Sequence, residues 1–378
     1  MRVAYFVHDL SDPAVHRRAR MLSAAGASVK IAGFRRAHQL PRPIPGAEVF
    51  ELGVTHDARL AHRAAVTLMG MARAGRLAPV VEGAQVIIAR MLESLALASA
   101  AQRACNPRAP LVYECLDIHR LMLADGLKGA LMRRVERTLL DRSNLLMVSS
   151  PAFLDAYFRP RQAIGQGRAM PTLVVENKVL RLDDGRAEPA PPPRNPGPPW
   201  RIGWFGMIRC RRSLEILKGL CARRPGEVEV VIRGQPTPAV FPDFEAEVAA
   251  APGLIWGGPY VSNELPELYR SIHFVWTPDW YEDGLNSNWL LPNRLYEGGL
   301  YGAVPIARAG VEVGHWLARH DLGVAFSDPS ELDGFFAELT PQTWGDLEGQ
   351  VRAADPSLFA ADRGECEQLL HSLERLAA

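Results

Sequence analysis

Short apolar runs alternate with amphipathic stretches along almost the whole chain. In the first half, the pattern predicts strands at 2–7, 28–34, 84–90, 110–116, 144–150 and 171–178, and helices at 13–27, 92–105, 127–142 and 151–158. In the second half, it predicts strands at 200–206, 228–234, 254–258, 273–278, 303–308 and 323–326, and helices at 213–224, 263–272, 292–302 and 310–320. Continuous apolar strands that alternate with helices are typical of parallel sheets covered on both faces. Each half is therefore expected to be a Rossmann-like, doubly wound α/β domain.

A proline-rich stretch, DGRAEPAPPPRNPGPP at 184–199, separates the two halves. Proline lacks a backbone N–H and blocks the interior of helices and sheets, so this stretch is expected to be an extended linker. The predicted domains are 1–183 and 200–360, followed by a C-terminal helix at 361–378 that packs back on the first domain. Two such domains would place the carboxyl ends of their strands on either side of a ligand-binding cleft.

Composition narrows the class of protein. The chain has 378 residues, which suits two domains, and its 48% hydrophobic and 22% charged residues are typical of a globular protein. A formal net charge of +1 argues against a nucleic-acid partner bound through bulk charge. The five cysteines are scattered without a CxxC pair, as in reducing compartments. No signal-peptide pattern or membrane-spanning apolar run is found, so a cytoplasmic location is expected.

The stretch LPNRLYEGGLYGAVPIA at 291–307 is the first candidate site. A helix N-terminus favours anions, and the planar guanidinium of Arg294 suits a phosphate. Glu297 lies on the same face of the first turn and could accept hydrogen bonds from ribose hydroxyls. Gly298 and Gly299 are expected to let a ligand approach the backbone closely. The alternative is a helix cap with an exposed ion pair.

The stretch GWFGMIRCRRS, after the first strand of the second half, is the next candidate. Gly206 is expected at the strand end, and Arg209, Arg211 and Arg212 in the loop before the next helix. Arginines at such a turn can clamp a diphosphate, although a solvated basic loop is the alternative. Because both basic segments follow strands of one domain, they are expected to converge on one ligand.

These motifs resemble the donor site of GT-B-fold glycosyltransferases, especially the family 4-like enzymes of bacterial polysaccharide synthesis. The positions that match the family pattern Pro-x-Lys-Leu-x-Glu-x-x-Ala-x-Gly-x-Pro-Val-x-Ala are Pro292, Leu295, Glu297, Gly302 and Ala307. Arg294 takes the place of its lysine, and Arg212 matches the lysine of a second motif. The resemblance implies that Glu297 holds the nucleotide ribose and that Arg294 contacts the diphosphate. SDPAVHRRARMLSAAGASVKIAGF and VVENKV are similar to further family segments.

Three features depart from the family pattern. Trp289 stands where the family usually has a second glutamate, so Glu282 or Asp283 in YEDGLN is the candidate replacement. Glu282 is therefore expected to bind the donor. Asn293, which precedes Arg294, is also an expected donor-binding residue. The glycine pair expected after the first strand is replaced by HDLSDP, and the Pro-Val order is reversed at Val304–Pro305. The first two departures leave retention or inversion of configuration open.

The first half offers residues for the acceptor. Asp117 and His119 follow a predicted strand, one residue apart, and are the candidates for a catalytic base. His8 and Asp9 follow the first strand, and Glu93 starts a helix, so these three are expected to bind the acceptor. The alternatives are a capping role for His8, a structural hydrogen bond for His119, and interaction of Glu93 with the helix dipole.

Basic residues on the first half suggest a membrane surface. Residues 59–76 combine arginines with an apolar stripe, as in helices that lie on anionic membranes. The alternative is a core-facing helix with a solvated basic face. The arginines that could extend this surface toward an acceptor diphosphate are Arg17, Arg18, Arg20, Arg35 and Arg36.

Together these features predict a metal-independent glycosyltransferase, since the sequence has no Asp-x-Asp metal motif and arginines could neutralise the leaving group. The expected donor is a nucleotide-diphosphate sugar, with UDP favoured and GDP as the alternative, and no cofactor is expected. The expected acceptor is a lipid-linked glycan of exopolysaccharide synthesis, at the inner face of the membrane. The alternatives are a nucleotide-sugar 2-epimerase of the same fold and an inactive nucleotide-sugar-binding partner subunit.

Overall fold

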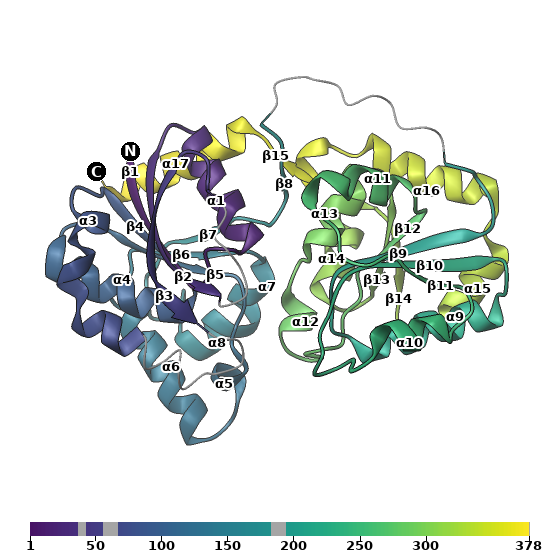
Figure 1. The fold of residues 1–378 in the computed structure, drawn as a ribbon, viewed down its shortest axis with the longest axis horizontal. Helices are drawn as coiled ribbons and strands as arrows, with labels where there is room; N and C mark the ends of the chain where they lie inside the picture. Colours follow the sequence, from purple (N-terminus) through teal and green to yellow (C-terminus); the bar gives the residue numbers. More distant parts are fainter. Residues whose placement is uncertain (37–42, 56–66, 183–193, 378) are drawn as a thin grey trace. The chain divides into compact units, whose positions relative to one another are not determined.

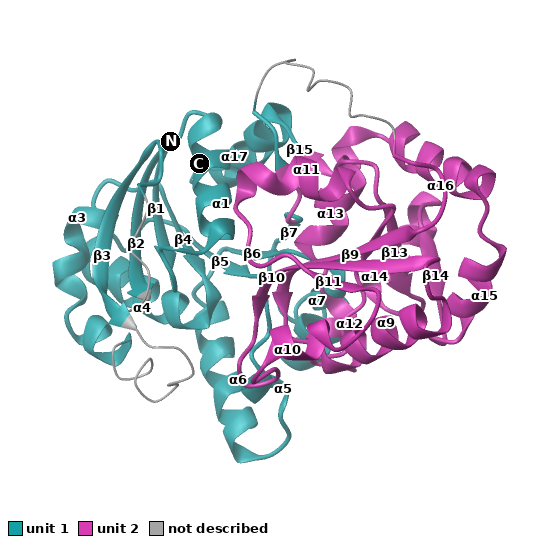
Figure 2. Ribbon diagram, turned by 45° about the vertical axis from the view of Figure 1, so that its right-hand side comes forward, with its two compact units in different colours: residues 1–176, 180–182, 361–378 teal, residues 177–179, 183–360 magenta. Residues whose placement is uncertain are grey.

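The computed structural model describes residues 1–36, 43–55, 67–182 and 194–377. The chain forms two compact units, each built on one parallel sheet with helices on its faces (Figure 1). Figure 2 shows unit 1, which comprises residues 1–176, 180–182 and 361–378, and unit 2, which comprises residues 177–179 and 183–360. Positions 184–193 of the expected linker lie outside the described residues.

Unit 1 contains a seven-stranded parallel sheet with the strand order β3-β2-β1-β4-β5-β6-β7. Its strands are β1 (Arg2–Val7), β2 (Ser28–Arg36), β3 (Ala47–Thr55), β4 (Val86–Arg90), β5 (Leu111–Cys115), β6 (Leu145–Val148) and β7 (Thr172–Val174). The central strands β1, β4, β5 and β6 are almost wholly buried, because helices cover both of their faces. The order reverses between β1 and β4, which makes this edge the topological switch point of the unit.

Helices of unit 1 connect these strands. They are α1 (Pro13–Ala24), α3 (Ala78–Val81), α4 (Met91–Cys105), α5 (Arg120–Leu123), α6 (Leu127–Leu140), α7 (Pro151–Phe153), α8 (Arg159–Gln162) and α17 (Arg363–Ala377). A 3-10 turn covers Ala74–Leu77, and a π-helical turn covers Leu154–Phe158. The last helix, α17, packs against α1 and adds Cys366, Leu369 and Leu373 to the same hydrophobic core as β1.

Unit 2 repeats this architecture with six parallel strands in the order β11-β10-β9-β12-β13-β14. Its strands are β9 (Trp200–Ile208), β10 (Val228–Pro236), β11 (Leu254–Trp256), β12 (Phe274–Trp276), β13 (Val304–Arg308) and β14 (Val324–Phe326). Its helices are α9 (Arg211–Arg223), α10 (Phe244–Ala249), α11 (Leu265–Arg270), α12 (Asn286–Trp289), α13 (Asn293–Leu300), α14 (Glu312–His320), α15 (Glu331–Glu338) and α16 (Pro341–Ala353). Short 3-10 turns lie at Ser262–Glu264 and Pro356–Leu358. The strands β8 (Val179–Leu180) and β15 (Ala360–Ala361) form a separate two-stranded sheet.

Arg194, within the proline-rich stretch, is an anchor of unit 2. Its guanidinium is buried and donates hydrogen bonds to four backbone carbonyls, including Tyr269 O at 3.0 Å and Gly302 O at 2.9 Å. It also pairs with the Glu348 carboxylate. A buried cation needs such partners. Residue 194, although it falls within the predicted linker 184–199, is therefore packed as part of unit 2.

Some elements differ from the predicted pattern. The edge strand β3 was not predicted, because its exposed and half-buried side chains give no apolar run beside the preceding prolines. The helices α15 and α16 were not predicted either. Of the predicted basic helix at 59–76, residues 59–66 lie outside the described residues, and the described part is helical at 67–72 before a 3-10 turn. Within the described ranges, no helix has the length and apolarity to cross a membrane.

Candidate functional site

The carboxyl edge of the unit 2 sheet gathers most of the predicted donor residues. The strand order reverses between β9 and β12, and ligands of such sheets bind beside this reversal. The segment from Arg209 follows β9, while the long loop 277–285 and helix α13 follow β12. Parallel strands thus bring the two predicted basic segments to one edge.

Gly206 lies inside β9 rather than at its end, since the strand continues to Ile208. It pairs with Gly234 of β10, and both have positive φ angles, 105° and 136°. A Cβ atom on Gly234 would lie 1.9 Å from the carbonyl oxygen of Gly206. The two strands therefore need glycine at this pair, where both residues have positive φ angles and the backbones approach closely.

Arg294, in the first turn of α13, points back to the end of β12. Its Nη2 donates to the carbonyl oxygens of Thr277 at 3.1 Å and Pro278 at 3.4 Å. Its Nε is buried and has no hydrogen-bond partner. Burial lowers the pKa of Arg294, and Asp279 opposes this effect. A buried guanidinium donor without an acceptor is a position where an anionic ligand would be stabilised.

Glu297 lies three residues after Arg294 on the same turn of α13. Its Oε2 accepts a hydrogen bond from the hydroxyl of Tyr269 at 2.8 Å. Tyr269 is fully buried on α11, and burial, followed by the charge of Glu297, raises its pKa well above the usual value. The same two causes raise the pKa of Tyr260, whose hydroxyl lies near Gly206. The charge of Glu297 therefore acts on two tyrosines, and the hydroxyl of one of them, Tyr260, lies near Gly206 of β9.

Gly298 and Gly299 have a different role from the one predicted. Both are buried, and a Cβ atom on Gly298 would lie 2.5 Å from a methyl group of Val275 in β12. A Cβ atom on Gly299 would lie 2.1 Å from the ring of Phe359. The prediction that they keep the turn open to a ligand is therefore wrong. Gly298 allows α13 to pack closely on β12, and Gly299 allows it to pack closely on Phe359.

Arg209 is held by a carboxylate in the same unit. Its Nε and Nη2 donate to Asp279 Oδ2 at 3.3 and 3.2 Å, and its guanidinium lies 5.0 Å from the centre of the Tyr281 ring. Asp279 is only 7% exposed, so the pair is partly desolvated. The charge of Arg209 is thus offset within the protein rather than free for a ligand.

Arg211 and Arg212 begin helix α9 and do not lie in a loop as predicted. Arg211 pairs with Glu247 and donates to Val240 O at 2.7 Å, so it is committed to α10 and its neighbourhood. Arg212 is exposed and lies over the Trp280 ring at 5.1 Å. The guanidinium of Arg308 lies 4.7 Å from the centre of the same ring. Of the three predicted arginines, Arg209 and Arg212 therefore contact the loop after β12.

The acidic residues of this loop have partners in the protein. Glu282 accepts from Asn286 Nδ2 at 2.7 Å, and Asp283 accepts from Arg308 Nη1 at 2.8 Å. Asn293 is exposed at the start of α13. Trp289, at the position of the missing family glutamate, ends the short helix α12. Glu282 is half-buried and Asp283 is exposed, so the position of the Glu282 carboxylate is more restricted than that of Asp283.

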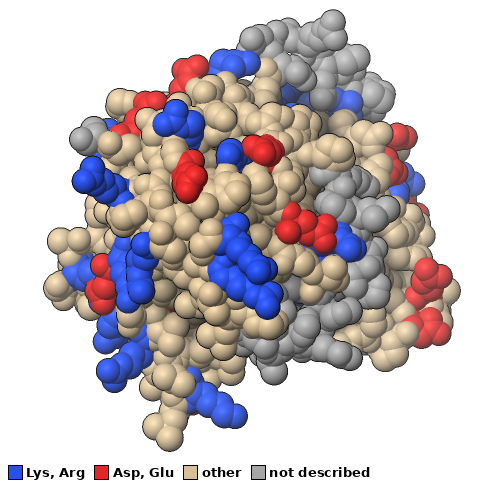
Figure 3. Space-filling view, turned by 60° about the vertical axis from the view of Figure 1, so that its left-hand side comes forward, with Lys and Arg blue, Asp and Glu red and all other residues tan. Residues whose placement is uncertain are grey.

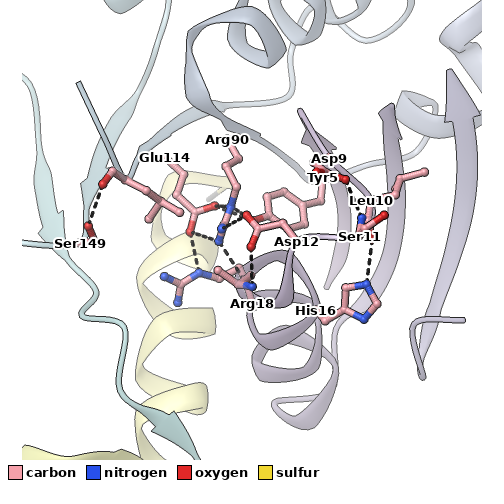
Figure 4. Close-up of polar contacts among 12 residues, drawn as sticks. Tyr5, Asp9, Leu10, Ser11, Asp12, His16, Arg18, Arg90, Glu114 and Ser149 are labelled. Carbon is pink, nitrogen blue, oxygen red and sulfur yellow. Dashed lines mark hydrogen bonds and ion pairs between the residues drawn. The ribbon is translucent and has the colours of Figure 1, made fainter. Parts of the chain in front are cut away.

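A buried ionic network lies at the switch point of unit 1 (Figure 4). Arg90, at the end of β4, donates to both carboxylate oxygens of Glu114 in β5, at 3.0 and 3.2 Å. Arg18 of α1 donates to Glu114 Oε1 at 2.7 Å, and Tyr5 of β1 donates to Oε2 at 2.6 Å. Burial alone would raise the pKa of Glu114, but Arg90 and Arg18 outweigh it and hold the pKa at about 2. Arg18 is therefore a core residue, which corrects its assignment to a basic surface.

The network also fixes the loop after β1. Arg90 Nη2 donates to Ala14 O at 3.1 Å, and its Nη1 lies 3.5 Å from the Asp12 carboxylate, which caps α1. The sequence motifs did not identify Arg90 and Glu114. The available signal was a charged residue within or at the end of an otherwise apolar strand, because a buried charge requires a partner.

Several buried polar atoms around this loop have no hydrogen-bond partner. They are His8 Nδ1, Ser11 Oγ, Arg90 Nη1 and Ser94 Oγ. Burial lowers the pKa of His8, and Arg90 acts in the same direction against three nearby carboxylates, which favours the neutral imidazole. Such a cluster at a switch point can receive hydroxyl groups of a ligand.

The other predicted acceptor residues lie at the same edge. Asp9 Oδ1 accepts from the Ser11 backbone N–H at 2.9 Å, and Glu93 lies in the first turn of α4. Met91, two residues before Glu93, has a φ of 67°, and this left-handed backbone conformation is strained for a residue other than glycine. The structure thus brings His8, Asp9 and Glu93 to the β1 and β4 ends.

Asp117 and His119 do not extend a strand, because β5 ends at Cys115. Asp117 is exposed, and its backbone carbonyl accepts a hydrogen bond from Cys115 Sγ at 3.5 Å. His119 caps α5, since its Nδ1 accepts from the Leu121 N–H at 3.2 Å. Asp117 and His119 therefore do not share one side of a strand, and His119 has the structural hydrogen bond that was the alternative.

No protein-family model matches the chain. The succinoglycan biosynthesis protein ExoL of Rhizobium meliloti (strain 1021) is 41% identical over 383 residues, covering 100% of this chain and 94% of ExoL. Sucrose-phosphate synthase from Thermosynechococcus elongatus superposes with a TM-score of 0.70 at 17% identity, covering 99% of this chain and 98% of that chain. HepE of Anabaena, solved with UDP and glucose, gives 0.67 at 15% identity over 99% of both chains. WaaG, a glycosyltransferase involved in lipopolysaccharide biosynthesis, gives 0.55 at 12% identity over 99% of this chain and 98% of WaaG.

Two Rossmann-like units and these structural neighbours define the GT-B fold of glycosyltransferases, which confirms the fold expected from the sequence. Within this class, the chain belongs to the family of the succinoglycan biosynthesis protein ExoL.

Proposed function

We propose that the chain transfers a sugar from a nucleotide-diphosphate donor to a glycan acceptor in the synthesis of an exopolysaccharide. Two comparisons support this proposal. The relative ExoL acts in succinoglycan biosynthesis, and the structural neighbour HepE was solved with UDP and glucose. A UDP-sugar is accordingly the favoured donor, and a lipid-linked saccharide is the proposed acceptor.

One observation carries the donor assignment: Arg294 and Glu297 lie on one turn of α13 at the switch point of unit 2. Arg294 Nε is a buried donor without an acceptor, and Glu297 is a carboxylate held by Tyr269. In the proposal, Arg294 stabilises the diphosphate, including the negative charge that develops on it as leaving group. Glu297 accepts hydrogen bonds from the ribose diol.

The other proposed donor residues act less directly on the ligand than Arg294 and Glu297. Gly206 borders the ligand from β9, while Asn293 and Glu282 border it from α13 and the loop after β12. Arg209 would act through Asp279, by holding the loop that carries Trp280. Arg212 contributes long-range positive charge from the start of α9.

The acceptor is assigned to the carboxyl edge of the unit 1 sheet. His8, Asp9 and Glu93 are proposed to bind its hydroxyl groups, next to the unpartnered Ser11 and Ser94 hydroxyls. Asp117, exposed after β5, is proposed as the base that deprotonates the attacking hydroxyl.

Calorimetric titration with UDP, UDP-glucose and GDP tests the donor site directly. Wild-type protein should bind UDP, and Arg294→Lys should weaken binding by about tenfold, because lysine keeps the charge but loses the Nε donor and the planar fork. Arg223→Lys, in an exposed pair with Asp333, is the matched control. Equal UDP affinity of wild type and Arg294→Lys would refute the assignment of Arg294.

Transfer is tested with radiolabelled UDP-glucose and a lipid extract that contains saccharide acceptors. Appearance of label in the lipid fraction supports the transferase. Conversion of the donor sugar without an acceptor would instead identify an epimerase. Binding of UDP with neither product would identify a nucleotide-sugar-binding subunit.

A further inference from the structure

Helix α6 of unit 1 exposes an apolar stripe to solvent. Leu127, Leu131 and Val135 are 90%, 63% and 41% exposed, and their spacing of four residues places them along one face. The opposite face of the helix is buried through Gly129, Glu136, Leu139 and Leu140. The helix therefore packs on unit 1 through one face, and the apolar stripe on its other face has no packing role among the described residues.

Basic residues border this stripe. At 100° per residue, Arg134 lies on one side of the stripe and Lys128 on the other, and both are exposed. Their long aliphatic stems can follow the apolar face while the charged ends reach polar groups at its rim. Figure 1 shows α5 and α6 at the lowest part of unit 1. In the space-filling view of Figure 3, Lys and Arg side chains lie on either side of the lowest part.

A basic surface pocket of about 440 Å³ lies on the same helix. Its lining residues are Ala130, Arg133, Arg134, Arg137, Thr138 and Asp141. Asp141, the only acidic residue of the lining, is paired with Arg168. Arg133 donates to the carbonyls of Met122 and Ala124 at 2.8 Å each, which ties α5 to this wall of the pocket. The pocket thus combines three guanidinium groups beside the apolar stripe.

We propose that α6 docks unit 1 on an anionic phospholipid bilayer. The stripe of Leu127, Leu131 and Val135 enters the interface, while Lys128, Arg134 and the pocket meet lipid phosphate groups. A second copy of the chain fits this face poorly, because pairing two stripes would bring their basic rims together. The inference goes beyond the proposed function, since it requires no nucleotide sugar. It also moves the expected membrane contact from residues 59–76 to α6.

Cosedimentation with vesicles of pure phosphatidylcholine, or of phosphatidylcholine with phosphatidylglycerol, tests the proposal with the full chain. Wild type should bind the phosphatidylglycerol vesicles and lose most binding at 0.5 M NaCl, where surface charges are screened to about 3–5 Å. The double variant Leu127→Gln/Leu131→Gln should lower the partition coefficient by at least about tenfold, because glutamine retains helix propensity but removes apolar area. The double variant Lys128→Gln/Arg134→Gln should bind more weakly and show less salt dependence.

Matched controls separate this surface from general changes in apolarity or charge. Ile255→Gln/Val261→Gln removes two exposed apolar residues of unit 2, and Arg103→Gln/Lys218→Gln removes two exposed charges elsewhere. Both controls should bind vesicles like wild type. Failure of wild type to bind, or equal losses in a control and its matched α6 variant, would overturn the proposal. A dimer in analytical ultracentrifugation that the Leu127→Gln/Leu131→Gln variant loses would identify a second copy as the occupant instead. Because UDP titration of the α6 variants reports on unit 2 alone, failure of vesicle binding is distinguishable from failure of the proposed transfer.

Discussion

The Tyr269 hydroxyl donates a hydrogen bond to Glu297 Oε2 at 2.8 Å, which joins a buried residue of helix α11 to helix α13. One carboxylate oxygen is thereby committed, and the carboxylate is held in a fixed orientation. A ribose diol would meet a group that is already oriented, so less conformational entropy is lost on binding.

Replacing Glu297 should weaken nucleotide binding. Glu297→Ala is expected to lower UDP affinity by about ten- to a hundredfold, because hydrogen bonds to a charged group are stronger than neutral ones. Calorimetric titration with UDP and GDP measures the change. Glu267→Ala, which removes an exposed carboxylate of α11, is the control and should leave affinity intact. An unchanged UDP affinity in Glu297→Ala would remove the basis of the donor site.

Two variants separate the proposed base from its neighbour. Asp117→Asn should abolish transfer to the acceptor while UDP affinity stays at the wild-type value. His119→Asn should keep both transfer and thermal stability, since asparagine is a strong helix cap, whereas His119→Ala should lower the unfolding free energy by about 1 kcal/mol. Full transfer activity in Asp117→Asn would show that another group is the base. Loss of transfer in a stable His119→Asn protein would return His119 to the chemistry.

The ionic network of unit 1 predicts a strong dependence on Glu114. Glu114→Gln leaves Arg90 and Arg18 buried without their shared carboxylate, which should cost about 3–5 kcal/mol of unfolding free energy. Because the pKa of Glu114 is depressed to about 2, its stabilisation is fully present above the unfolded pKa near 4.5 and is lost as pH falls toward 2. Urea unfolding at pH 7 measures the loss. Glu51→Gln, in a solvent-exposed pair with Arg35, should change stability by less than about 1 kcal/mol.

A second buried carboxyl group should behave in the opposite way. Glu136 accepts hydrogen bonds from Tyr157, Gln162 and Tyr113, and burial raises its pKa to about 7 despite these bonds. The folded state therefore keeps its proton while the unfolded chain loses it, so stability falls as pH rises from about 4.5 to 7. Glu136→Gln should remove this loss, which is worth about 3 kcal/mol above pH 7.

Thermal unfolding at pH 5 and pH 8 checks this prediction. The melting temperature of Glu136→Gln should exceed that of wild type at pH 8 and approach it at pH 5. The exposed Glu338→Gln variant should follow wild type at both values. A Glu136→Gln protein that is less stable than wild type at pH 8 would mean that the ionised carboxylate stabilises the fold.

Most strands of this fold could be predicted from the sequence, because buried parallel strands are continuous apolar runs such as RVAYFV and HFVWTP. It also places Arg294 and Glu297 on one turn, since their spacing alone determines that. The exposed edge strand β3 lacks such a run and could not be recognised in this way.

Contacts between distant residues account for the rest. Arg90 and Glu114 are 24 residues apart, and Arg18 is 96 residues from Glu114, so no local pattern links them. The sequence around Gly298 and Gly299 resembles a ligand-binding turn. In the structure, however, glycine is needed at these positions because Val275 and Phe359 leave no room for a Cβ atom. Likewise, only the observed end of β5 shows that His119 caps a helix.

The packing of α17 has a consequence for synthesis of the chain. Its side chains Cys366, Leu369 and Leu373 belong to the core that also contains Val3 and Tyr5. On the ribosome, the first strands are made hundreds of residues before this helix emerges. Unit 2 can complete its hydrophobic core before α17 is synthesised, whereas unit 1 cannot. We therefore expect unit 2 to finish folding before unit 1, although unit 1 begins at the N-terminus. Nascent chains arrested before residue 363 should therefore expose apolar surface of unit 1 to chaperones.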